Sequence, residues 1–191
     1  MRRITMLAAG LLLAAFGASS AAAQDVAKVD VFGGYTYMYG NVVTTGRGIS
    51  LNGGIGSAAY NFNNWLGLAA DFGVYHQGNV AASGASLTVE TYLAGPRLNW
   101  RKGEKFVPFA QVLVGGGHAG GGVFTTGGHA LGTQNGFAMT AGGGVDWNVN
   151  SRISVRLFQA EYLRTQFNNG VNSNQNNFRL SAGVVFHFGK H

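Results

Sequence analysis

Residues 177–188 read NFRLSAGVVFHF, and this stretch decides the fold class. Apolar and aromatic side chains occupy every second position, whereas Arg179 and His187 fall on the alternate positions. A period of two indicates a β-strand with one apolar face. Because that face is rich in aromatic residues and the other carries charge, the pattern is typical of a strand in a lipid-embedded barrel with its polar groups inside.

The same alternation recurs along the chain and predicts eight strands. Their approximate ranges are 29–39, 51–62, 65–75, 87–100, 106–115, 137–149, 153–165 and 177–188. In the seventh strand the apolar positions change parity between Leu157 and Phe158. An extra residue there would keep one continuous outer face, so we predict a β-bulge at Leu157–Phe158.

The connectors between these strands are alternately short and long. The short ones are 61–64, 101–105 and 150–152, and the long ones are 40–50, 76–85, 116–136 and 166–176. Transmembrane barrels show this asymmetry, with short periplasmic turns and longer external loops. Aromatic residues near the strand ends predict girdles at the two membrane interfaces: Tyr35, Tyr37, Tyr39, Trp65, Trp100, Trp147, Phe186 and Phe188.

The composition agrees with a barrel in lipid. Only 10% of the 191 residues are charged, yet the mean hydropathy is just +0.09. A soluble domain usually carries more charge, and a helical membrane protein is more apolar. The absence of Cys excludes disulfides and thiol catalysis. The net charge of +6 comes without a basic stripe interleaved with aromatic residues, so we expect no nucleic-acid binding.

The N-terminal segment predicts export from the cytoplasm. Arg2 and Arg3 precede an apolar run over 4–16, and Ala21-Ala22-Ala23 supplies small residues for cleavage. This order is typical of a secretory signal peptide, which we place at 1–23, with the barrel at 24–191. Removing Arg2 and Arg3 lowers the net charge from +6 to about +4. Together with the lipid-facing pattern, the leader predicts the outer membrane as the destination.

Five segments carry a resemblance to a known family: Phe32-Gly33-Gly34-Tyr35, Asn64-Trp65-Leu66-Gly67-Leu68, Gly95-Pro96-Arg97, Pro108-Phe109-Ala110 and Asn177-Phe178-Arg179-Leu180-Ser181-Ala182-Gly183. In order and spacing they resemble the outer-membrane protein β-barrel domain family, the small eight-stranded barrels of OmpA type and opacity type. The resemblance implies an all-β, antiparallel, up-and-down transmembrane β-barrel. It also implies the outer-membrane insertion machinery as a partner during biogenesis. We expect a monomer in contact with outer-membrane lipid.

Six charged residues fall on the inward positions of the predicted strands: Asp71, Arg97, Asp146, Arg156, Glu161 and Arg179. They predict a polar network in the barrel interior, which is either a salt-bridged plug or an ion path. An eight-stranded barrel is just wide enough to be filled by its own side chains, which favours the plug. Placing Arg179 on the lipid face instead would cost about 2–4 kcal/mol near the bilayer midplane.

Other chemical motifs are weak. The run Gly54–Ala59 matches a dinucleotide fingerprint but lacks the helix that the motif requires. His76, His118 and His129 lie in or beside the long connectors without the spacing of a preformed metal site, so we predict no metal and no cofactor. Ser181 and Glu161 face inward without a histidine at matching height, because His187 lies about 20 Å away along the strand.

These observations predict a non-enzymatic integral outer-membrane protein. Its role would be structural or surface-exposed, with external loops that bind partners. A narrow pore for ions or very small solutes is the first alternative, and a lipid-modifying enzyme is the second. A secreted soluble barrel would need an apolar interior, and the inward charges argue against it.

Overall fold

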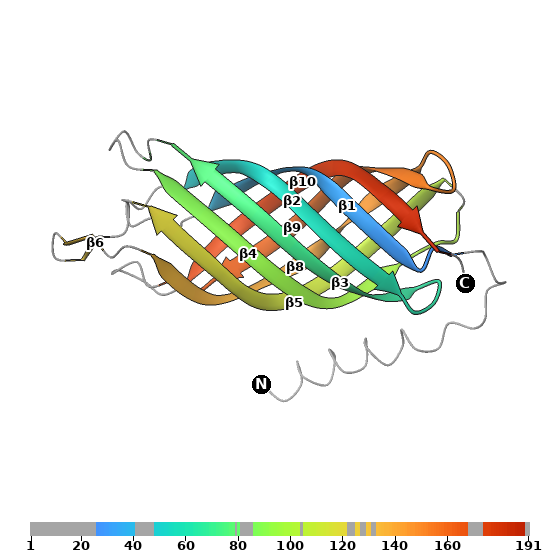
Figure 1. The fold of residues 1–191 in the computed structure, drawn as a ribbon, viewed down its shortest axis with the longest axis horizontal. Helices are drawn as coiled ribbons and strands as arrows, with labels where there is room; N and C mark the ends of the chain where they lie inside the picture. Colours follow the sequence, from blue (N-terminus) through green and yellow to red (C-terminus); the bar gives the residue numbers. More distant parts are fainter. Residues whose placement is uncertain are drawn as a thin grey trace, which may run out of the picture.

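The computed structural model describes residues 26–40, 48–78, 80, 86–103, 105–121, 125–126, 129–130, 133–167 and 174–189. Eight long antiparallel strands close into one barrel in the order β1-β10-β9-β8-β5-β4-β3-β2 (Figure 1). They are β1 (Val29–Gly40), β2 (Ile49–Asn61), β3 (Leu66–Gln77), β4 (Leu87–Asn99), β5 (Phe106–Gly121), β8 (Gln134–Asn148), β9 (Ile153–Thr165) and β10 (Gln175–Phe188). The prediction of an all-β, eight-stranded, up-and-down barrel is confirmed.

The first and last strands join the sheet into a cylinder. They pair without interruption from Val29 opposite Phe188 to Gly40 opposite Asn177. Closure removes the unpaired backbone edge, for which lipid would offer no hydrogen-bonding partner. The described residues contain no helix that is both long and apolar enough to cross a membrane. The expected signal peptide lies outside the described residues.

The two ends of the barrel differ, and we call them the turn end and the loop end. Short connectors close the turn end between β2 and β3, β4 and β5, and β8 and β9. Asn63 Oδ1 accepts the backbone N–H of Leu66, and Asn150 Oδ1 accepts that of Ile153. An asparagine that bonds its own backbone a few residues on stabilises a tight turn. The strand ends that the longer connectors join all lie at the loop end.

The predicted bulge in β9 is confirmed. Phe158 pairs with Val145 of β8, but the next pair joins Asp146 to Arg156, so Leu157 has no partner there. Leu157 and Phe158 both point outward and are 45% and 46% exposed. The bulge therefore returns the charged residues of β9 to the inner face after two consecutive outward residues.

The region predicted as a connector over 116–136 contains more structure than expected. β5 continues to Gly121 and β8 begins at Gln134, so that His118 lies opposite Asn135. Two short strands, β6 (Thr125–Thr126) and β7 (His129–Ala130), pair beyond them. A glycine-rich segment lacks apolar and polar alternation, so the sequence pattern could not reveal that the strands extend this far.

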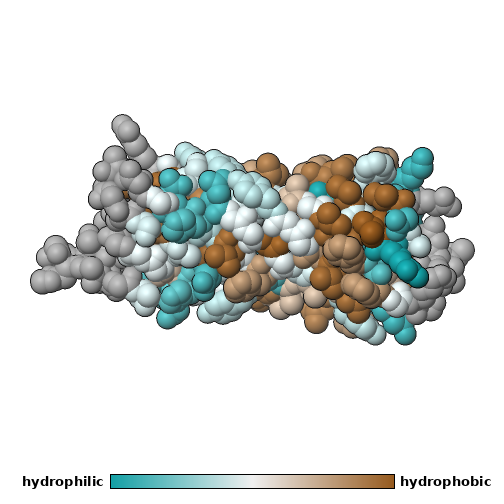
Figure 2. Space-filling model, turned by 45° about the horizontal axis from the view of Figure 1, so that its top comes forward, coloured by the Kyte–Doolittle hydropathy of each residue, from teal (hydrophilic) through white to brown (hydrophobic). Residues whose placement is uncertain are grey.

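The outer wall of the barrel carries exposed apolar and aromatic side chains, and along β10 they run from Phe178 near the loop end to Phe188 at the turn end. On the face shown in Figure 2, hydrophobic residues gather over the half nearest the turn end, while the half towards the loop end is mostly neutral or hydrophilic. Of the eight aromatic residues predicted for the girdles, all except Tyr37 are exposed on this wall. Tyr37 is half-buried, and its hydroxyl lies 2.7 Å from Ser50 Oγ.

Candidate functional site

The six predicted interior residues all point into the barrel. They come from five strands, Asp71 from β3, Arg97 from β4, Asp146 from β8, Arg156 and Glu161 from β9, and Arg179 from β10, and none is more than 6% exposed. The structure joins them into one hydrogen-bonded and ion-paired network. Three arginines and three carboxylates make the network neutral when all are ionised.

Arg179 forms hydrogen bonds with residues from opposite sides of the barrel wall. Its guanidinium donates to Asp71 at 3.0 and 3.2 Å and to Glu161 at 2.8 Å, and also to the Tyr75 hydroxyl at 2.8 Å. β10 and β3 are separated by β1 and β2 in the sheet, so the Arg179–Asp71 pair crosses the lumen. Gln111 of β5 donates to the other oxygen of Glu161 at 2.9 Å.

Arg156 forms a second centre nearer the turn end. It donates to both oxygens of Asp146, at 2.7 and 2.9 Å, a bidentate geometry that is among the stronger hydrogen-bond types. Arg97 approaches the same carboxylate at 3.5 Å. The ring of Phe109 contacts both guanidinium groups, with its centroid 3.8 Å from Arg97 Cζ and 4.3 Å from Arg156 Cζ. Its negative faces reduce the repulsion between two like charges in a dry interior.

Gln159 connects the two centres. Its Oε1 accepts from Arg156 at 2.6 Å, and its Nε2 donates to Glu161 at 2.7 Å. A continuous chain therefore runs from Arg97 through the interior to Asp71. Gln159, Gln111, Tyr75 and Phe109 were not predicted as parts of the site, although their inward position in the alternating pattern was a usable signal.

An apolar layer covers the network on the side of the loop end. Along β9, Leu163 follows Glu161 on the inner face, and it belongs to a cluster of fully buried side chains that includes Met38, Leu51, Leu87, Leu113 and Phe167. Phe167 lies beyond the end of β9 and is held by Gln175, which accepts its N–H at 2.8 Å and donates to its carbonyl at 2.9 Å. This cluster therefore lies between the charges and the loop end.

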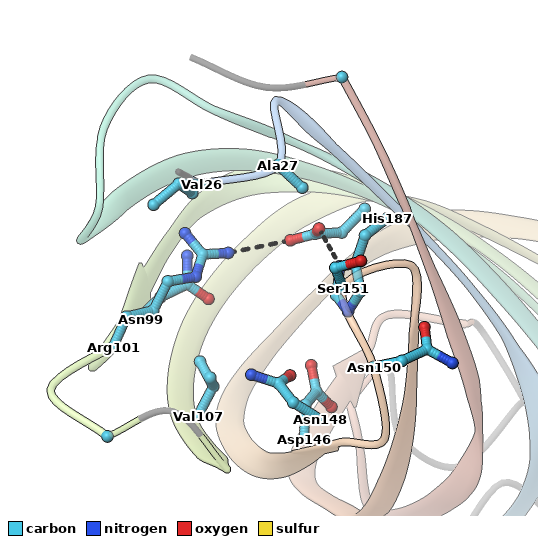
Figure 3. A pocket seen from close by; sticks show the side chains of 13 residues that line it. Val26, Ala27, Asn99, Arg101, Val107, Asp146, Asn148, Asn150, Ser151 and His187 are labelled. Atoms are coloured by element: carbon cyan, nitrogen blue, oxygen red, sulfur yellow. Dashed lines mark hydrogen bonds and ion pairs between the residues drawn. The ribbon is translucent and has the colours of Figure 1, made fainter. Parts of the chain in front are cut away.

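A cavity of about 360 Å³ opens at the turn end (Figure 3). Asp30 lies at the wall of this cavity and accepts hydrogen bonds from Arg101 at 3.1 Å and from His187 at 2.7 Å. Asn61 donates to Asp30 as well, at 2.8 Å. Burial lowers the pKa of the Arg101 guanidinium from its usual value, and the carboxylates of Asp30 and Asp146 partly oppose that shift. Asp146, a carboxylate of the interior network, also lines the cavity.

Asp30, His187 and Ser154 form a chain with the connectivity of a catalytic triad. His187 Nδ1 lies 2.7 Å from Asp30, and its Nε2 lies 2.6 Å from Ser154 Oγ. A nucleophile must be reachable by its substrate, but Ser154 is fully buried and its hydroxyl also donates to Asn148 at 2.7 Å. Because these residues sit on β1, β10 and β9, the chain joins neighbouring strands where the barrel closes.

The comparison of the sequence with family models decides the identity of the fold. The model for the outer membrane protein beta-barrel domain matches residues 8–188. The chain belongs to this family. No curated protein sequence matches the chain.

Solved structures of other outer-membrane barrels share the architecture. Neisserial surface protein A superimposes with a TM-score of 0.60 at 18% identity, covering 86% of this chain and 100% of that one. Ail, the attachment invasion locus protein of Yersinia pestis, gives 0.57 at 18% identity, covering 84% of this chain and 99% of that one. The N-terminal β-barrel domain of OprF from Pseudomonas aeruginosa gives 0.50 at 17% identity, with 86% and 100% covered. At these identities the likeness concerns the fold alone.

The loop-end histidines of this outer-membrane barrel are not gathered. His76 Nδ1 lies 2.9 Å from Thr88 Oγ1, and His118 Nδ1 lies 2.7 Å from Asn135 Oδ1. The side chain of His129 lies outside the described residues. Within the described part of the chain, no group of three or more His, Asp or Glu side chains could hold a metal ion.

Proposed function

We propose that this outer-membrane barrel is a closed, non-enzymatic anchor that presents its long connectors at the cell surface. The observation that carries the proposal is the filled interior, in which a neutral ionic network is covered by an apolar layer. A hydrated ion needs a continuous polar path, and an apolar layer across the lumen opposes its passage. The burial of Ser154 supports the absence of enzymatic activity, since its hydroxyl cannot meet a substrate.

The chemistry of the long connectors bears on the partner they would bind. Residues 40–50, 76–85, 116–136 and 166–176 hold Arg47 as their only Lys, Arg, Asp or Glu, together with many Gly, Asn, Thr and Ser residues. Ail has been solved with the heparin analogue sucrose octasulfate. A polyanion of that kind would find a single arginine here, so we infer an uncharged partner held by hydrogen bonds, which salt would weaken little.

A narrow pore remains the second candidate, because the turn-end cavity of about 360 Å³ opens to one side of the membrane. Planar-bilayer recording separates the two functions. The closed anchor predicts no unitary conductance at any voltage, with a reconstituted porin in the same membranes as the positive control. Discrete steps that grow with salt concentration would establish the pore and overturn the anchor.

Surface presentation is tested by single-cysteine labelling. Because the chain contains no Cys, the introduced residue is the only thiol that can react. Thr133 is exposed at the loop end and Ser151 is exposed at the turn end. We expect a membrane-impermeant maleimide to label Thr133→Cys on intact cells and to label Ser151→Cys only after the outer membrane is permeabilised. The reverse pattern would mean that the long connectors face the periplasm.

A further inference from the structure

An aromatic row crosses three strands of the outer wall near the loop end. Tyr39 of β1 lies opposite Phe178 of β10, which lies opposite Tyr162 of β9. Each of the three side chains is 49% exposed, and a groove of about 380 Å³ runs between them. Asn176 also lines this groove, and its Oδ1 accepts the hydroxyl of Tyr162.

The spacing along β10 places this row at the edge of the hydrocarbon. The outward face of β10 runs from Phe178 to Phe188. Ten residues span roughly 33 Å along a strand, and a tilt of about 35–45° reduces this to about 23–27 Å across the membrane. That height agrees with the apolar band of about 25 Å in outer-membrane barrels. Residues beyond the row towards the loop end therefore lie among the lipid headgroups.

One cationic side chain lies at the level of the lipid headgroups. Arg164 follows Tyr162 by two positions on the same face of β9 and lies opposite Asn176. Arg97, Arg156 and Arg179 point inward, so Arg164 is the only Lys or Arg on the outer face of the described strands. It forms no ion pair with any described residue. Its Nη2 donates to Asn174 at 2.8 Å, while its Nε is shielded from water and has no hydrogen-bond partner among the described residues.

We propose that this face binds a phosphorylated glycolipid of the outer leaflet. The phosphate would meet Arg164, whose planar guanidinium suits bidentate contact with phosphate oxygens, beside the amide groups of Asn174 and Asn176. One acyl chain would lie in the groove against Tyr39 and Phe178, since aromatic rings favour this interface. The assignment rests on charge complementarity, on the height of Arg164 and on the proposed orientation with the loop end outside, which the cysteine labelling tests separately. It is independent of what the connectors bind.

The test uses the full mature barrel in zwitterionic detergent and counts bound lipid by native mass spectrometry. The probes are lipid A, phosphatidylglycerol and phosphatidylethanolamine. Wild type should retain lipid A, and Arg164→Gln should weaken that binding by roughly fivefold, the effect of one cation at an anionic lipid surface. Asn174→Ala should weaken it less. Arg152→Gln, an exposed arginine at the turn end, should bind as wild type does.

Arg164 and Asn174 are surface residues outside the interior network, so both variants should fold and shift with heating on gels as wild type does. Equal lipid A binding by wild type and Arg164→Gln would overturn the site. Equal loss in Arg152→Gln would show that only net charge matters. If phosphatidylglycerol bound as tightly as lipid A, any anionic lipid would suffice and the assignment to a glycolipid would be wrong.

Discussion

Replacing Arg179 with methionine tests whether the interior network holds the barrel together. Arg179 is fully buried and pairs with Asp71 and Glu161. Methionine removes the cation and keeps an unbranched side chain, so both carboxylates lose a buried partner. Breaking a buried ion pair by removing one member costs about 3–5 kcal/mol, and we expect a loss of that size in the free energy of unfolding. The assay is urea unfolding in lipid vesicles, followed by tryptophan fluorescence from Trp65, Trp100 and Trp147.

A compensated variant distinguishes loss of pairing from loss of packing. Arg179→Met combined with Asp71→Asn and Glu161→Gln removes the stranded charges, and replacing a whole buried cluster is often close to neutral. The triple variant should therefore recover most of the lost stability. Arg152→Met, in an exposed turn, should change stability by less than about 0.5 kcal/mol. If Arg179→Met cost under 1 kcal/mol, or if the triple variant unfolded as easily as the single one, the network would not be a source of stability.

Three further changes probe the wall and its lining, each measured by the same urea assay. An added Cβ at Gly142 would lie 2.3 Å from a backbone oxygen of β9, so Gly142→Ala should lower the free energy of unfolding by about 1–3 kcal/mol. Gly54→Ala is the control, because the added Cβ would have no atom closer than 4.0 Å, and it should change the free energy of unfolding by no more than about 0.5 kcal/mol. Deleting Leu157 removes the bulge and leaves the alternation of β9 intact, so that variant should still fold. Deleting Ala160 moves a polar side chain of the inner wall towards lipid, so it should destabilise the barrel far more than the deletion of Leu157 does. Phe109→Leu removes the ring that contacts two guanidinium groups and should cost about 1–2 kcal/mol; an unchanged midpoint would refute this contact as a source of stability.

The period-two pattern predicted the architecture because a barrel wall in lipid has two chemically distinct faces. Strands with a clear alternation were placed closely: 177–188 lies within two residues of the observed ends of β10, and 137–149 begins three residues after the observed start of β8. The parity change at Leu157–Phe158 even located the bulge. The inward charges could be assigned for the same reason, since an arginine on the hydrocarbon side costs too much.

The sequence could not show which interior residues contact one another. Arg179 and Asp71 lie 108 positions apart, and their pairing depends on the tilt and stagger of strands across the lumen. Neutral members such as Gln159 give no charge signal, so their role as connectors emerges only from the geometry. The extension of β5 to Gly121 was missed because glycine marks neither face. Asp30, His187 and Ser154 lie on three different strands, and the alternation along each strand does not show which residues of different strands are in contact.

The interior network also specifies the register of the sheet. The outer wall gains little from contact with lipid, because acyl chains are as apolar as the side chains they touch. A slip of one residue in the pairing of one strand would exchange the two faces of that strand, and the arginine it carries, Arg97 on β4, Arg156 on β9 or Arg179 on β10, would turn towards the hydrocarbon. The cost of an arginine on the lipid face is about 2–4 kcal/mol at the midplane and about 0–1 kcal/mol near the interfaces, so it depends on the depth of each residue. The same slip would also break the buried ion pairs of that arginine, so the pairing and the cost of exposure to lipid both oppose it.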